Sequence, residues 1–81
     1  MNEAKKEAVK NNVDGLSMED LVLLEKMTRL VCAKYENITK RYDGSIDTSQ
    51  PKYAAFKKYN DIHNVIIEKM ELLINKAFSN D

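Results

Sequence analysis

Heptad spacing in the last third of the sequence limits what this chain can fold into. Mainly apolar side chains recur there at alternating gaps of three and four residues, at Phe56, Tyr59, His63, Ile66, Met70, Leu73 and Ala77. This spacing places them on one face of an α-helix and is typical of a helix that packs against other helices. The stretch therefore predicts a long helix in an all-α fold.

A second long helix is predicted earlier in the chain. Ser17 is placed to act as its N-cap, and Leu16 and Leu21 have the spacing of a hydrophobic staple. Gly44 can adopt the left-handed conformation that ends many helices, so we expect the helix to cover about residues 18–43. Leu23 and Leu30 flank its predicted inner stripe on one side, and Leu21 and Cys32 flank it on the other. The inner stripe itself consists of Leu24, Met27, Val31, Tyr35, Ile38 and Tyr42.

The two helices are joined by a short loop, residues 44–50, that is rich in turn-forming residues. Pro51 fits the first position of the next helix, where its missing N–H is not needed, with Gln50 or Ser49 as the cap. The later helix is expected to cover about residues 51–78. Because the loop is short, residues 16–81 are predicted to form an antiparallel two-helix hairpin.

Residues 1–15 differ from the rest of the chain. They are polar, with few apolar side chains, and residues 11–15 read as a break. The sequence therefore predicts a mobile N-terminal arm before the hairpin.

A two-helix hairpin of this size has too small a core to be stable alone, since such cores rarely supply more than ~3–5 kcal/mol. Both helices also carry more apolar surface than one contact between them can bury. We therefore predict a homodimer that forms a four-helix bundle, or else a complex with a partner of different sequence. The predicted dimer seam consists of Phe56, Tyr59, His63, Ile66, Ile67, Met70, Leu73, Ile74, Leu23, Met27 and Leu30.

The charges indicate how two copies would meet. Residues 14–25 hold four acids and no base, whereas residues 34–58, around the hairpin tip, hold six bases and three acids. An antiparallel arrangement of two hairpins would bring acidic and basic ends together twice, so we favour it over the parallel one.

Composition limits the class of protein. The chain has 81 residues with 13 basic and 13 acidic side chains, so we expect one domain without a charge bias toward nucleic acid or membrane. The single cysteine, Cys32, excludes an internal disulfide and a multi-thiolate metal site. We expect no cofactor, no metal and no membrane partner, a cytoplasmic location and, from the many lysines and asparagines, a bacterial or phage origin.

The hairpin tip is the candidate partner-binding surface. Basic residues are interleaved there with aromatic ones, a pattern that can hold phosphates and stack bases. A Rop-like dimer, in which two helical hairpins grip RNA, is the architectural analogue. The candidate binding residues are Lys40, Arg41, Lys52, Tyr53, Lys57 and Lys58.

Two short patterns on the later helix resemble phosphorelay proteins. Residues 61–66, with Asp61 close to His63, resemble the phospho-accepting helix of histidine kinases, although the heptad spacing directs His63 inward and the chain has no ATP-binding domain. Pro51 followed by Asp61 also resembles small helical aspartyl-phosphate phosphatases, but their Ser-Gln-Glu-Leu-Asp motif is replaced by residues 57–61. Asp61 is otherwise expected to pair with Lys57.

Taken together, these features predict a small non-enzymatic, intracellular protein-binding module, an adaptor or inhibitor that acts through helical surfaces of a homodimer. A Rop-like nucleic-acid binder is the alternative, and a phosphorelay-related protein is the third hypothesis. The unidentified protein partner is expected at the tip or on apolar flanks that the dimer leaves uncovered.

Overall fold

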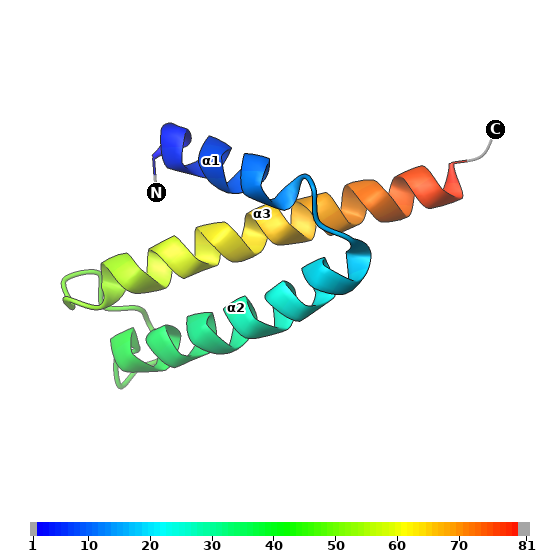
Figure 1. Ribbon diagram of the computed structural model, residues 1–81. Coiled ribbons are helices and arrows are strands. Elements are labelled where there is room, and N and C mark those ends of the chain that lie inside the picture. Colours follow the sequence, from blue (N-terminus) through cyan, green and yellow to red (C-terminus); the bar gives the residue numbers. More distant parts are fainter. Residues whose placement is uncertain (1, 80–81) are drawn as a thin grey trace.

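The computed structural model describes residues 2–79, which form three helices: α1 (Glu3–Val13), α2 (Met18–Thr39) and α3 (Tyr53–Phe78). Helices α2 and α3 lie side by side and antiparallel, while α1 runs along the middle of α3 in the same direction as α3 (Figure 1). The all-α fold predicted from the sequence is confirmed. The structure has three helices, whereas the sequence predicts a two-helix hairpin.

Helix α1 occupies the segment for which the sequence predicts an unpacked arm. The side chain of Asn2 caps its first turn, because Asn2 Oδ1 accepts the Lys5 N–H at 2.9 Å. Val9 and Val13 are four residues apart, so they lie on one face of the helix, and Val13 is only 6% exposed. This small apolar face packs against α3, and its burial stabilises α1 as a helix.

Helix α2 begins where the sequence predicts and ends four residues early. Ser17 Oγ accepts the Asp20 N–H at 3.2 Å, which confirms the N-cap. After Thr39 the chain turns extended at Lys40, which pairs with Ile46 in an isolated β-bridge. Gly44 has the positive φ that its position suggested, +90°, but it does not end the helix. Its N–H donates to the Arg41 carbonyl and closes a turn in the loop.

The buried face of α2 is rotated relative to the predicted inner stripe. Leu21 is fully buried and Thr39 is 1% exposed, whereas Met27 and Ile38 are 53% and 42% exposed. Thr39 tolerates burial because its hydroxyl donates to the Tyr35 carbonyl of its own helix at 2.9 Å, and Thr28 makes the same kind of bond. Thr28 and Thr39 therefore occupy inward positions that the apolar pattern assigned to the outside, because their hydroxyls bond to carbonyls of the same helix.

The connection between α2 and α3 is longer than predicted and is built from two similar turns. Asp43 Oδ1 accepts from the N–H and hydroxyl of Ser45, and Asp47 Oδ1 does the same for Ser49. Helix α3 then starts at Tyr53, two residues after the predicted start. Its N-cap position is Lys52, and no side chain caps the helix, so the prediction of Pro51 at the first helical position with Gln50 or Ser49 as the cap is wrong. Gln50 Oε1 instead accepts the Lys52 N–H at 2.6 Å in the turn before the helix.

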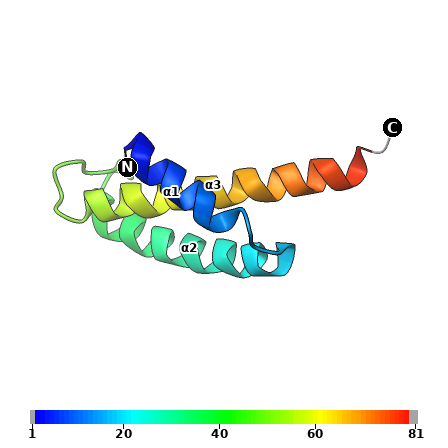
Figure 2. The ribbon, with the colours of Figure 1, turned by 45° about the horizontal axis from the view of Figure 1, so that its top comes forward.

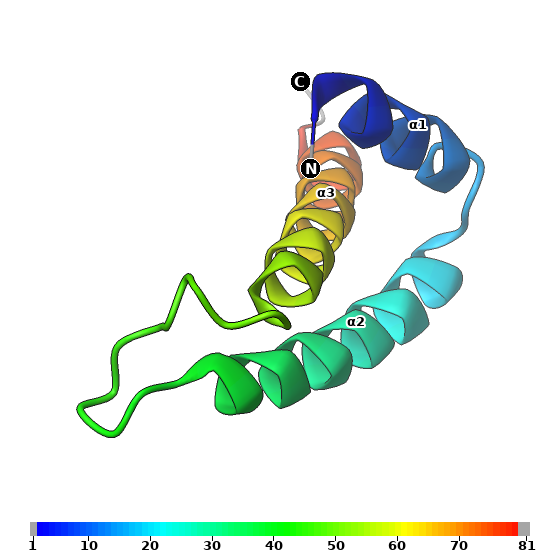
Figure 3. The same ribbon diagram turned by 90° about the vertical axis from the view of Figure 1, so that its left-hand side faces the viewer.

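The core lies where the three helices meet. Its buried members come from all three, since Val13 belongs to α1, Leu21 to α2, and Val65 and Ile66 to α3. Figure 3, which views the molecule from one end, shows α1 and α2 each lying next to α3. Partly buried side chains surround this centre, namely Val9, Leu16, Leu24, Ile62, Met70 and Leu73.

Candidate binding surfaces

A polar contact fixes the position of α2 against α3. His63 Nε2 lies 2.8 Å from Glu25 Oε2, and Arg29 Nε contacts the same oxygen at 3.3 Å. The side chains of Glu25 and His63 are only 16% and 21% exposed. The hydrogen bond from His63, aided by the charge of Arg29, lowers the pKa of Glu25 below the usual glutamate range against the raising effect of burial.

This contact differs from two predictions: the spacing of Glu25 and Arg29 predicts an ion pair on a solvated helix face, and counting back from the loop places His63 near Leu30. Glu25 does pair with Arg29, but it does not belong to a solvated face, because its carboxylate reaches across to α3. His63 was expected near Leu30, yet Leu30 is 71% exposed and points away from the core. His63 Nε2 already contacts the Glu25 carboxylate, so this contact would have to break before Nε2 could accept a phosphoryl group.

Further contacts toward the loop complete the α2–α3 interface. The Tyr35 and Tyr59 rings stack with centroids 5.6 Å apart and planes 3° from parallel. Cys32 Sγ lies 3.8 Å from Asn60 Oδ1, and burial raises the pKa of this thiol, with a smaller contribution from Glu36. The thiol therefore behaves as a packed side chain, as the sequence indicated.

The residues predicted as a dimer seam fall into two groups, apart from Ile74, which is 46% exposed near the end of α3. Those on the first part of α3 face the other helices of the same molecule and are buried or half-buried, namely Phe56, Tyr59, His63, Ile66, Ile67, Met70 and Leu73. Those on α2 face outward, since Leu23, Met27 and Leu30 are 58%, 53% and 71% exposed. We call these three residues the α2 stripe.

A second exposed apolar surface lies at the end of α3. This part of the helix extends past the start of α2 and past α1 (Figure 2). Ile74 and Phe78 are 46% and 82% exposed on it, whereas Leu72, 64% exposed, lies beside the end of α1. We call Ile74 and Phe78 the α3 overhang.

The loop end of the molecule carries the predicted basic-aromatic surface. Its basic members Lys40, Arg41, Lys52, Lys57 and Lys58 are all exposed. Two of them are engaged: the Arg41 guanidinium contacts an Asp47 carboxylate oxygen at 3.3 Å, and the Lys58 ammonium lies 5.6 Å from the Tyr59 ring centroid.

The aromatic side chains of this end are placed differently from the expectation. Tyr53 was expected to be exposed, but it is half-buried and its ring contacts Phe56 with centroids 6.2 Å apart. Tyr42 was expected on the inner stripe, but it is fully exposed because α2 ends at Thr39 and Tyr42 lies in the loop.

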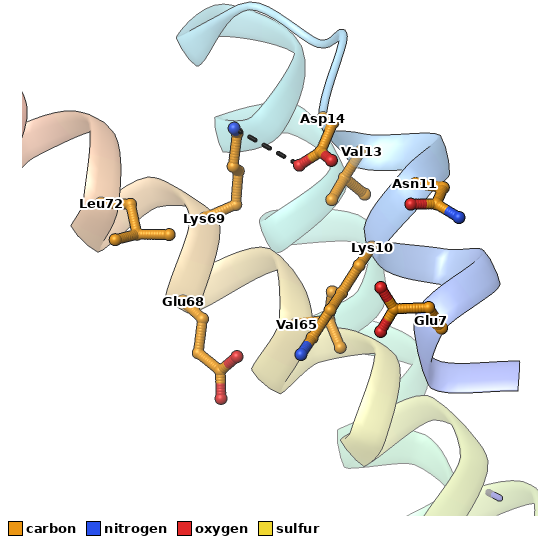
Figure 4. A pocket seen from close by; sticks show the side chains of 9 residues that line it. All are labelled: Glu7, Lys10, Asn11, Val13, Asp14, Val65, Glu68, Lys69 and Leu72. Carbon is orange, nitrogen blue, oxygen red and sulfur yellow. Dashed lines mark ion pairs between the residues drawn. The ribbon is translucent and has the colours of Figure 1, made fainter. Parts of the chain in front are cut away.

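A shallow groove of about 210 Å³ between α1 and α3 has no counterpart in the sequence predictions. Its walls mix charged and apolar side chains, and the ion pair between Lys69 and Asp14, 3.4 Å, closes one end (Figure 4). The spacing of Val9 and Val13 was the available signal for a packed α1. The groove is lined by Glu7, Lys10, Asn11, Val13, Asp14, Val65, Glu68, Lys69 and Leu72.

Comparisons of this chain with protein-family models, with curated proteins and with solved structures find no match. Among residues 2–79, no helix is long and apolar enough to cross a membrane. The same residues contain no group of three or more His, Cys, Asp or Glu side chains placed to hold a metal ion.

Proposed function

We propose that this chain is a small non-enzymatic protein-binding module of the cytoplasm, an adaptor or inhibitor that works as a homodimer through its helical surfaces. The observation that carries the proposal is the exposure of large apolar side chains that share a helix face in two places, the α2 stripe and the α3 overhang. Exposed apolar side chains gathered on one face mark interaction sites in folded proteins.

The packing of α1 strengthens this argument. A two-helix hairpin leaves apolar surface on several sides, and α1 covers one of them by packing Val13 against Val65. The α2 stripe and the α3 overhang lie outside this cover and stay exposed with all three helices in place. The third helix thus reduces the uncovered surface and leaves two separate patches, one for a second copy and one for a different protein.

The α3 overhang is the surface we assign to the different protein. Ile74 and Phe78 are four residues apart and lie on one face of α3, which is the arrangement by which a helix enters an apolar groove of a partner. A large exposed aromatic side chain is also the kind of residue that dominates binding energy at such contacts.

The test places a photo-crosslinking amino acid at position 75, between Ile74 and Phe78, in the protein expressed in its natural host. We expect one dominant protein to be crosslinked, and we expect Phe78→Asp to abolish that crosslink while a matched exposed change, Lys57→Glu, leaves it intact. An unchanged crosslinking pattern in Phe78→Asp would contradict the proposal. Circular dichroism of both variants verifies that the helices are retained.

A Rop-like nucleic-acid binder is the second candidate, favoured by the full exposure of Tyr42, which follows the exposed Lys40 and Arg41 in the loop. An exposed aromatic ring among basic side chains can stack on a nucleobase while the basic side chains contact phosphates. RNA binding that falls steeply with salt and is lost in the double variant Lys57→Glu, Lys58→Glu would support this candidate over the first. Indifference to RNA and DNA at low salt would remove it.

A further inference from the structure

The α2 stripe has a charge at each end, and the two charges are opposite. Leu23, Met27 and Leu30 follow one another at gaps of four and three residues, and the next position of the same face is Lys34. At the other end the acids Glu19 and Asp20 lie in the first turn of α2. All these side chains are exposed, and the ion pairs described above use other residues.

We propose that a second copy of this chain docks on the α2 stripe, with the two α2 helices antiparallel about a two-fold axis near Met27. The proposal rests on the self-association in the proposed function and specifies the surface and the orientation. In this arrangement Leu23 of each copy faces Leu30 of the other, and Lys34 of each copy faces Glu19 and Asp20 of the other.

The pattern of the surface supports a second copy as the occupant. A two-fold contact requires a surface that is complementary to itself when turned end to end. The α2 stripe, with Lys26 on its flank, lies between an acidic end and a basic end and meets this requirement, because rotation about Met27 exchanges Asp20 with Lys34. The parallel arrangement would place Lys34 against Lys34 and acids against acids, so charge favours the antiparallel one.

The size of the surface sets the expected strength. The stripe spans about two turns of one helix, which is at the small end of specific protein contacts. We therefore expect a dimer that dissociates on dilution in the micromolar range or above, about 10⁻⁶–10⁻⁴ M, and not an obligate one. The α3 overhang stays uncovered in this dimer and free for the different protein.

The test uses charge exchange and sedimentation equilibrium at low salt. Lys34→Glu alone, and Glu19→Lys with Asp20→Lys, each place like charges opposite one another twice, so we expect each to weaken dimerisation by about 10-fold or more. Combining all three changes restores opposite charges, and this variant is expected to dimerise within about 3-fold of the unmodified protein. An equimolar mixture of the first two variants is expected to form a heterodimer, and Lys5→Glu, on the exposed side of α1, is the control that is expected to leave dimerisation unchanged.

Each outcome decides something definite. A dimer that responds to none of the charge changes overturns this docking surface but leaves the proposed self-association standing. A protein that stays monomeric at about 10⁻³ M overturns the docking and the homodimer together, whereas the crosslinking of the α3 overhang still tests the binding role. Weakening without recovery in both the combined variant and the mixture also overturns the proposal, since circular dichroism checks that the two variants in the mixture are folded.

Discussion

Leu21 and Leu30 are both on α2, and their replacement by alanine should have very different effects on stability. Leu21 is fully buried where the three helices meet, with Val13, Val65 and Ile66 in the same cluster. Leu30 is 71% exposed on the opposite side of the helix. Because both changes are Leu→Ala within one helix, helix propensity is the same for both, and the difference between them reports burial alone.

The magnitude follows from the surroundings of each side chain. Truncation of a buried leucine costs about 2–5 kcal/mol, depending on how far the site relaxes. The partly exposed neighbours Leu16 and Leu24 can move toward Leu21, so we expect the lower part of that range, about 2–3 kcal/mol. For a domain of this size, that loss lowers Tm by roughly 10–20 °C. Leu30→Ala should stay within about 0.5 kcal/mol of the unmodified protein.

Circular dichroism during thermal and urea unfolding measures both variants. The experiments use protein dilute enough to be monomeric, so that an effect on self-association does not add to an effect on folding. The urea midpoint is the preferred readout, because an unchanged slope shows that the unfolded state has not changed.

Equal destabilisation by Leu21→Ala and Leu30→Ala would refute this reasoning. It would mean that α2 presents the face predicted from its sequence pattern, with Met27 and Leu30 toward α3. The α2 stripe would then be buried and could not bind a second copy. A loss at Leu21 alone supports the rotation of α2 that the structure shows.

Three further predictions concern other contacts. The pKa of Glu25 is lower in the folded protein than in the unfolded chain, so its contribution to stability is present above about pH 4.3 and is lost as the pH falls through the folded pKa. The urea midpoint of Glu25→Gln should therefore change less with pH, between about 3 and 5, than that of the unmodified protein. Val13→Ala should cost about 1–2 kcal/mol and speed amide exchange in α1, measured by mass spectrometry, whereas equal exchange in both proteins would show that α1 does not depend on this contact. Gly44→Ala should cost about 1 kcal/mol in urea unfolding because its φ is +90°, while Gly15→Ala, which has open space and no positive φ, should cost nothing.

Much of the helical framework could be predicted from local sequence signals. The N-cap at Ser17 and the turn residues between the long helices located α2 and α3 to within a few residues. The end of α2 was placed too late, because the prediction depended on Gly44 as the first glycine after the helix. Pairing of Lys40 with Ile46 ends the helix earlier, and this pairing depends on the loop as a whole.

The candidate surfaces were less predictable than the helices. The heptad spacing of α3 predicts a packing face, but whether that face packs within one molecule or between two depends on where α2 and α1 lie. Helix α1 was missed as a packed element because two valines provide little apolar surface by themselves. Their burial depends on Val65, which is more than fifty residues away in the sequence.

The sequence by itself determined that the chain is helical, where the two long helices begin, and that they carry more apolar surface than two packed stripes can bury. Only the tertiary structure decided which part of that surface is left exposed. The physical reason is that a broad apolar arc allows several rotations of a helix with similar burial. On α2 the choice is made by contacts that no local pattern reveals: the approach of Glu25 to His63, the stacking of Tyr35 on Tyr59, and the burial of Thr39, whose hydroxyl donates to a carbonyl of its own helix.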